Sequence, residues 1–418
     1  MSYRDKTHQG ATPARRLALE ITHAARLRHA YVRELLDSAR TESTLDKKEF
    51  DFAQVLCFGV VACMGTLDEA IDYWVNDPSR LDPRVRDALR IEAYELLFLH
   101  KPAHVIVDQG VELVRIVEPH AAGLANAVLH RLSEEAEEFP WGNPATSDLA
   151  FARTYGVPVW LAQALIDQYG QEDASKQLAC GLEPAPTYLC ANPFREGQKF
   201  ASDLSAQFVA TLVPLKKTVL EIGAGRGTKT ALMEIRAKRT LGDTVLIDAV
   251  DLHEFKGKVL EKRMKSMGIA GVFSHTGDAR DLSKVEGLLD AYDTVLVDAP
   301  CSGTGTLRRH PEIRWHLTPE DANSLADLQF DLVCEASKRV RQGGTLVYST
   351  CSVLSGENEG VVEDFLASEQ GRDFKIVPIK VPESEKVPGW HATERGFFAS
   401  VPTSGGPDGH FAARLVRA

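Results

Sequence analysis

Two segments of the sequence place a cysteine where an apolar strand is expected to end. Cys301 follows the run DTVLVDAP, three residues after Asp298, and Cys351 follows the run GTLVYST. Most isolated cysteines are small core residues, and that interpretation suits the cysteines within apolar helical stretches. It fits poorly for two cysteines that both follow strand ends beside a glycine-rich loop. We therefore expect at least one of the pair to act chemically.

A thiol with a neighbouring acid could activate carbon 5 of a pyrimidine. Carbon 5 is a poor nucleophile, but a thiolate that adds to carbon 6 turns the ring into an enamine, whose carbon 5 can attack a sulfonium methyl group. Cysteine suits this step because its thiolate is strongly nucleophilic and can also leave, although its ordinary pKa of about 8.5 requires activation. Asp298 is placed to hold N3 or the exocyclic amine of the ring as charge develops.

A glycine-rich loop, EIGAGRGTKT at residues 221–230, follows the first predicted strand and precedes a helix. Glycines allow a tight turn and a close backbone approach to a ligand, and the first N–H groups of the helix face the same ligand. The pattern fits nucleotides, dinucleotides or S-adenosylmethionine. The candidate cofactor-binding residues here are Gly223, Ala224, Gly225, Arg226, Gly227, Thr228 and Lys229.

Acidic residues close the next two predicted strands. Asp251 ends the second strand and could accept hydrogen bonds from ribose hydroxyls, or it could instead cap the helix that follows. Asp278 closes the third strand and would lie near an adenine, although it could equally cap the next turn. We expect Asp251, Asp278 and Asp298 to complete the cofactor site.

The elements that position these residues alternate between strand and helix from about residue 200 onward. Such alternation predicts a Rossmann-like α/β domain with a mostly parallel sheet, whose ligands bind beyond the carboxyl ends of the strands. Residues 1–138 have helical periodicity throughout and predict an all-α domain. Residues 139–199 read as a linker and a short helical bridging region. The sheet domain is expected to span residues 200–418.

Composition limits the class of protein. The chain has 418 residues and a net charge of −11, which argues against indiscriminate binding to nucleic acid but allows a local basic groove. Its seven cysteines include no C-x-x-C pair, so we expect no metal. The polar N-terminus and the lack of a long apolar run predict no membrane association and a cytoplasmic location.

Several motifs resemble the Sun family of RNA cytosine-5 methyltransferases, most closely its bacterial ribosomal RNA small subunit methyltransferase B branch. The two specific matches are VDAPCSGTGTLRRHPEIRW at residues 297–315 and STCSVLSGENEGVVEDFL at residues 349–366. DLSAQFVATL at 203–212 and DGHFAARL at 408–415 are weaker matches. The segment 89–115 is similar to NusB-like RNA-binding domains, so the resemblance covers almost the whole chain.

This resemblance implies a role for each candidate residue. Cys351 matches the nucleophile that attacks carbon 6, Cys301 matches the second cysteine that assists product release, and Asp298 matches the acid that contacts the cytosine. The implied cofactor is S-adenosyl-L-methionine, and the implied partner is RNA, specifically small-subunit (16S) ribosomal RNA. We expect a monomer. Basic residues after the fourth strand are expected to contact RNA phosphates: Arg308, Arg309 and Arg314.

The sequence departs from the family pattern at three places. The usual loop C-A-A-P-G-G-K-T is replaced by Gly-Ala-Gly-Arg-Gly-Thr-Lys-Thr, which keeps Lys229. His410 stands where a phenylalanine is usual. The small RNA-binding subdomain before the catalytic sheet is truncated, because little sequence separates the bridging helices from the 203–212 motif. That truncation bears on the choice of RNA target.

Two alternatives remain open from the sequence. A DNA-type cytosine-5 methyltransferase would use Cys301, in its Pro-Cys pair, as the nucleophile; the Thr-Cys-Ser at Cys351 speaks against it. A non-catalytic RNA-binding or ribosome assembly factor could retain the fold with an altered cofactor loop; the presence of Asp298 and both cysteines speaks against that class.

Overall fold

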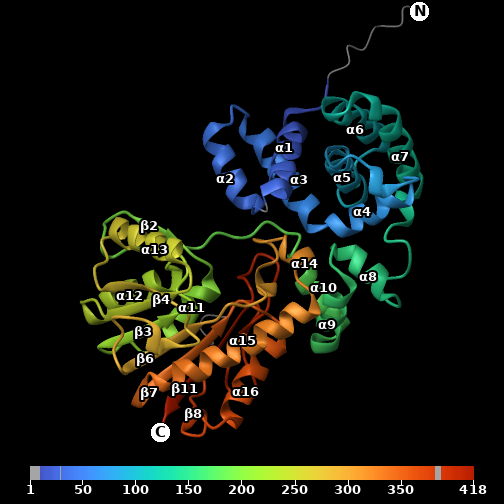
Figure 1. Cartoon of the computed structure of the whole chain (residues 1–418). Helices are drawn as coiled ribbons and strands as arrows, with labels where there is room; N and C mark the ends of the chain where they lie inside the picture. The colour runs from blue at the N-terminus through green and yellow to red at the C-terminus, as the bar shows by residue number, and fades with distance from the viewer. Residues whose placement is uncertain (1–9, 29, 382–386) are drawn as a thin grey trace, which may run out of the picture. The chain divides into compact units, whose positions relative to one another are not determined.

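The computed structural model describes residues 10–28, 30–381 and 387–418, and the chain forms two compact units. The helical unit comprises the chain up to Leu182 together with Leu307–His316, and the sheet unit comprises Glu183–Thr306 and Leu317–Ala418 (Figure 1). The predicted boundary at residue 138 therefore differs from the observed one. The bridging helices pack within the helical unit, because their apolar faces are too short to bury themselves alone.

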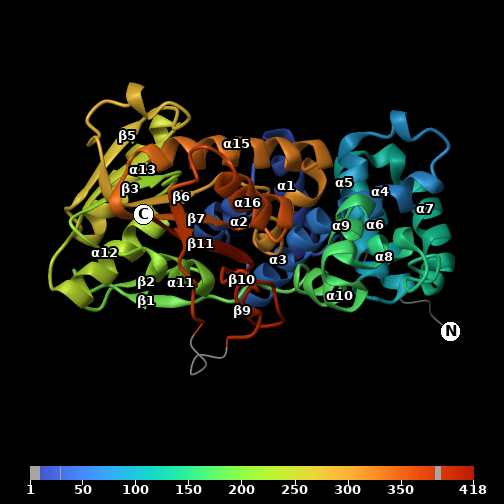
Figure 2. The same cartoon turned by 90° about the horizontal axis from the view of Figure 1, so that it is seen from below.

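The helical unit is all-α, as its periodicity predicts (Figure 2). Its core is one cluster of apolar side chains contributed mainly by α1, α3, α5, α6 and α7. Across the described part of the chain no single helix is long and apolar enough to cross a membrane. The bent helix pair Lys47–Ala62 and Met64–Tyr73 has a sufficient length and apolar composition only when its two helices are taken together. The helices are α1 (Pro13–Arg28), α2 (Val32–Glu42), α3 (Lys47–Ala62), α4 (Met64–Tyr73), α5 (Pro83–Leu97), α6 (Ala103–Val117), α7 (Ala122–Glu135), α8 (Asp148–Tyr155), α9 (Val159–Tyr169), α10 (Gln171–Cys180) and α14 (Ile313–His316).

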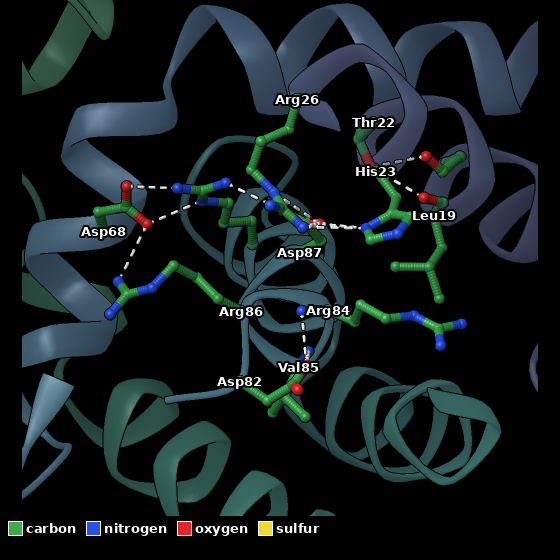
Figure 3. Close-up of polar contacts among 12 residues, drawn as sticks. Leu19, Thr22, His23, Arg26, Asp68, Asp82, Arg84, Val85, Arg86 and Asp87 are labelled. Atoms are coloured by element: carbon green, nitrogen blue, oxygen red, sulfur yellow. Dashed lines mark hydrogen bonds and ion pairs between the residues drawn. The ribbon is translucent and has the colours of Figure 1, made fainter. Parts of the chain in front are cut away.

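A charged network fixes α5 against α1 and α4 (Figure 3). Asp87 is buried and accepts hydrogen bonds from Arg26 of α1, at 2.8 Å, and from Arg90 of its own helix, at 3.1 Å. Arg90 also reaches Asp68 of α4 at 2.6 Å. Because each buried charge has a partner of opposite sign, the cost of removing these charges from water is offset. The network thus fixes the positions of α1, α4 and α5 relative to one another.

The segment Leu307–His316 belongs to the helical unit although its sequence neighbours belong to the sheet unit. Arg314 is fully buried and donates to the carbonyl oxygens of Leu307 and Gly181, at 3.0 and 2.8 Å. The indole N–H of Trp315 donates to the carbonyls of Val61 and Ala62 near the end of α3. These contacts satisfy backbone acceptors that a helix end leaves open.

The sheet unit contains a mostly parallel sheet with the strand order β5-β4-β3-β6-β7-β11-β10-β9. Strands β5, β4, β3, β6 and β7 run parallel, and β11 pairs antiparallel with β7, β8 and β10. This confirms the predicted Rossmann-like fold. The strands are β3 (Thr218–Ile222), β4 (Leu246–Asp251), β5 (Val272–Thr276), β6 (Tyr292–Asp298), β7 (Val340–Thr350), β8 (Phe374–Ile376), β9 (Trp390–Ala392), β10 (Phe398–Ser400) and β11 (His410–Arg417).

Helices cover both faces of this sheet. Apolar residues of α12 and α13 pack on one face, where α11 also contacts α12 and β11. The helices α15 and α16 pack on the other face. Both layers exclude water from the strands, so the polar strand ends are left as the places where a ligand can reach the sheet. The helices are α11 (Leu204–Leu212), α12 (Thr228–Leu241), α13 (Glu254–Met267), α15 (Pro319–Lys338) and α16 (Glu359–Ala367).

A two-stranded hairpin precedes the sheet, formed by β1 (Leu189–Ala191) and β2 (Lys199–Ala201). The sequence predicts only irregular structure here, because three-residue strands are too short to show an alternating pattern. Between α10 and α11 the described chain forms this hairpin as its regular secondary structure. The hairpin occupies the part of the sequence where the resemblance implies a truncated RNA-binding subdomain.

Candidate active site

The loop between β3 and α12 has the geometry of a ligand cradle. Gly223, Gly225 and Gly227 have φ values of 78°, 55° and 78°, in the left-handed region that favours glycine. A Cβ atom on Gly223 would lie 2.1 Å from the carbonyl oxygen of Asp298, so a side chain there would collide with the end of β6. The loop therefore lies directly against the strand that carries Asp298.

Asp251 links the second strand end to this loop. Its carboxylate accepts hydrogen bonds from the N–H groups of Gly225 and His253, both at 3.0 Å, so it also begins the turn before α13. The N–H of Gly277 donates to the carbonyl of Asp251, which brings the turn that carries Asp278 alongside. Asp278 is half-buried, and its hydrogen bonds from Arg280 lower its pKa.

An ion pair between buried Lys229, at the start of α12, and half-buried Asp298 joins the glycine loop to the end of β6. The ammonium of Lys229 lies 2.8 and 2.9 Å from the two carboxylate oxygens of Asp298. Burial opposes the charge on Lys229, yet the attraction of Asp298 outweighs it and raises the pKa of Lys229 above its ordinary value. Ser349, near the end of β7, donates to Asp298 at 3.2 Å. Three adjacent strand ends thus meet at one carboxylate.

Glu221 is a further polar group of this site that the sequence analysis did not single out. Its side chain is fully buried near the end of β3, and one carboxylate oxygen accepts a 2.5 Å hydrogen bond from Thr230. The other oxygen has no partner among the described residues. Burial raises the pKa of Glu221 to about 7. A charged residue inside an apolar strand, directly before the glycines, was the signal available in the sequence.

The two cysteines are in contact. The Sγ atoms of Cys301 and Cys351 are 3.3 Å apart, and the backbone N–H of Cys351 donates to Sγ of Cys301. Both side chains are half-buried. The hydrogen bond with Cys351, followed by burial, raises the pKa of the Cys301 thiol well above its ordinary value. The predicted meeting of these strand ends is therefore observed, and Cys301 is held as a neutral thiol.

One buried carboxylate holds the two cysteine loops together. Glu357 accepts hydrogen bonds from the backbone N–H and hydroxyl of Ser302, at 2.8 and 2.5 Å, and from the hydroxyl of Ser352, at 2.6 Å. Gln329 of α15 donates to the same carboxylate at 2.9 Å. Because Ser302 and Ser352 directly follow the two cysteines, Glu357 fixes the separation of the thiols. The sequence pattern alone does not mark this residue.

The predicted phosphate contacts are wrong for two of the three arginines. Arg314 is fully buried and its guanidinium donates to backbone carbonyls, and Arg308 is 5% exposed, so neither offers a free cationic surface to RNA. Arg309 is half-buried. The reason is that this segment packs as part of the helical unit rather than as a solvated loop.

Among residues 10–28, 30–381 and 387–418, no group of three histidine, cysteine, aspartate or glutamate side chains is arranged to hold a metal ion. The chemistry that the described site offers is that of two thiols, a carboxylate paired with an ammonium, and a glycine cradle.

The chain matches two family models. Residues 210–416 match the model described as 16S rRNA methyltransferase RsmB/F, and residues 12–134 match the NusB family. It is 30% identical to ribosomal RNA small subunit methyltransferase B of Thermus thermophilus, over 92% of each chain. The protein of the same name from Escherichia coli is 28% identical, over 90% of this chain and 92% of that protein.

A solved structure supports the fold. The crystal structure of PH0851 superposes with a TM-score of 0.76 and covers 97% of this chain and 99% of its own, at 22% sequence identity. At that identity the likeness concerns the fold alone.

Replacing Glu357 by alanine should loosen both cysteine loops. Each buried donor left without an acceptor costs about 1–3 kcal/mol, so amide exchange at residues 300–306 and 350–358 should speed up by at least about tenfold. Hydrogen exchange followed by mass spectrometry measures this. Glu363→Ala is the control. Glu363 is half-exposed on α16, the helix after Glu357, and pairs with Arg395, so its loss should leave exchange in the two cysteine loops unchanged. Equal protection in Glu357→Ala and the unmodified protein would contradict the positioning role.

Proposed function

The chain belongs to the RsmB/F family of ribosomal RNA methyltransferases, and we propose that it methylates carbon 5 of a cytosine in small-subunit ribosomal RNA. The observation that carries the proposal is the 3.3 Å contact between Cys301 and Cys351 at adjacent strand ends, beside Asp298. Two thiols and an acid at one sheet edge suit a covalent route through carbon 6. Because the proposed substrate is ribosomal RNA, we propose that the protein acts in the cytoplasm, and that it acts as a monomer.

Cys351 is proposed as the nucleophile. Once its thiol has lost its proton, its sulfur forms a bond to carbon 6 of the cytosine. Carbon 5 then takes the methyl group from the sulfonium sulfur of S-adenosylmethionine, whose bond to that methyl group breaks, so that S-adenosylhomocysteine leaves. Cys301 is a neutral thiol in the resting site. It first gives up its own proton to solvent, and its sulfur then assists removal of the proton from carbon 5. Loss of that proton restores the double bond and expels the sulfur of Cys351. Asp298 holds the cytosine edge, and the ammonium of Lys229, 2.8 Å away, holds the carboxylate in place.

The cofactor S-adenosyl-L-methionine supplies the methyl group. The residues of the site fit such a molecule on two observations: the cradle at Gly223 has no room for a side chain, and one oxygen of buried Glu221 lacks a partner. Asp251, next to the loop, suits the ribose hydroxyls. The residues proposed to hold the cofactor are Gly223, Ala224, Gly225, Arg226, Gly227, Thr228, Lys229, Asp251, Asp278 and Asp298.

The proposed RNA contacts draw on both units. The helical unit matches the NusB family, and we propose that it binds RNA. Arg309 remains the arginine of its segment proposed to contact phosphate. The target cytosine must expose carbon 5 and carbon 6 to a thiol and a methyl donor, which a stacked duplex prevents, so the target is proposed to be an unpaired or flipped base.

The cofactor site predicts a binding defect in Asp251→Ala. Loss of a buried ribose contact should weaken S-adenosylmethionine binding by roughly 1–3 kcal/mol, which titration calorimetry measures. Asp281→Ala is the matched control, because Asp281 pairs with Lys284 on the surface after the third strand. Unchanged affinity in Asp251→Ala would remove Asp251 from the site.

The two cysteines should behave differently when replaced. Cys351→Ala should form no covalent complex and transfer no methyl group, because carbon 6 is not attacked. Cys301→Ala should attack and methylate, then stall as a covalent protein–RNA adduct because the proton on carbon 5 stays. A denaturing gel after incubation with RNA and S-adenosylmethionine shows the adduct as a retarded band. Cys334→Ala, on α15, should behave as the unmodified protein.

Two results would redirect the assignment. An adduct in Cys351→Ala and none in Cys301→Ala would favour the DNA-type arrangement, with Cys301 as nucleophile. An unmodified protein that forms no adduct and transfers no methyl group to any RNA would favour a non-catalytic binding or assembly factor.

A further inference from the structure

His410 is a buried histidine that the proposed mechanism does not use. It begins β11, its side chain is 6% exposed, and its Nδ1 atom has no hydrogen-bond partner among the described residues. A buried polar atom without a partner costs free energy, so the surroundings of the ring decide what a histidine does in this position.

The register of the sheet places His410 on the same face as the reacting groups. In the pairing of β11 with β7, Phe411 lies opposite Thr350 and Ala412 lies opposite Ser349. Alternate residues of a strand share a face, so His410 shares the face of Ala412 and of its partner Ser349. Ser349 is the residue whose hydroxyl reaches Asp298. His410 therefore lies at the cysteine end of β7, on the Asp298 side.

Charged groups from several elements act on the ring. Burial lowers the pKa of His410 below its ordinary value, and the ammonium of Lys229 on α12 lowers it further. Asp203, at the start of α11, has an oxygen 3.9 Å from Nδ1. Three carboxylates raise the pKa of His410, but the net shift remains downward; they belong to Asp203, Asp408 and Asp298. The imidazole is consequently neutral at physiological pH.

We propose that His410 is a positioning residue that must be neutral for methyl transfer, because a neutral ring adds no positive charge beside the Lys229 ammonium, which lies 2.8 Å from Asp298. An imidazolium would place a second positive charge in the same buried space. It would repel Lys229, attract Asp203 and compete for Asp298, which would turn Asp298 from the cytosine. This inference rests on the proposed function of the site.

The acidic limb of the pH–rate profile tests this role. If the reaction requires one deprotonated thiol, kcat/KM falls about tenfold for each pH unit below the pKa of that thiol. If a second group must also be deprotonated, kcat/KM falls about a hundredfold for each pH unit below both pKa values. In the unmodified protein, the fall in kcat/KM should steepen from about tenfold to about a hundredfold per pH unit below the pKa of His410. His410→Phe, of similar shape and no charge, should keep the shallow slope throughout. His391→Phe, on exposed β9, is the control and should keep both slopes.

A titration of the ring by NMR gives a second readout that needs no activity. In the full-length protein labelled at histidine carbons, His410 should titrate below the ordinary histidine pKa, and Lys229→Met should raise that value. Identical acid limbs in His410→Phe and the unmodified protein would overturn the proposal, as would an NMR pKa that Lys229→Met leaves unchanged. Absence of any methyl transfer by the unmodified protein would count against the proposed function, and the NMR titration would still decide whether Lys229 acts on His410.

Discussion

The ion pair between Lys229 and Asp298 is the contact on which the site depends. It joins the first residues of α12 to the end of β6, and through Ser349 it includes the end of β7. Lys229 is buried and Asp298 is half-buried, and the ammonium of Lys229 needs this partner because an isolated buried ion costs several kcal/mol. The pair therefore fixes the glycine loop and the carboxylate relative to each other before any ligand binds.

A second buried carboxylate performs a similar task for the thiols. Glu357 accepts hydrogen bonds from the residues that follow both cysteines, so the Sγ contact is built into the fold. The two thiols share one hydrogen-bonded site but have different surroundings, and the pKa of Cys301 is raised. The contact places a second sulfur beside the candidate nucleophile, which suits a reaction with separate attack and proton-removal steps.

Local patterns in the sequence were sufficient to predict the parallel sheet, the glycine loop and the meeting of Asp298, Cys301 and Cys351, because strand ends of a parallel sheet share one edge. Contacts between distant segments were not predictable in this way. Arg314 donates to the carbonyl of Gly181, and the neighbouring Trp315 donates to the carbonyl of Val61 on α3, so the burial of this segment depends on residues far away in the chain. The roles of Glu357 and Glu221 likewise depend on burial, which a single polar residue in a motif does not reveal.

The central claim is methylation at carbon 5, and release of the hydrogen from that carbon tests it most directly. RNA carrying tritium at carbon 5 of cytosine is incubated with the protein and S-adenosylmethionine labelled in its methyl group with carbon-14. The account predicts that tritium appears in water in the same molar amount as methyl groups appear in RNA. Methyl transfer without release of tritium would place the methyl group on another atom and would contradict the covalent route through carbon 6.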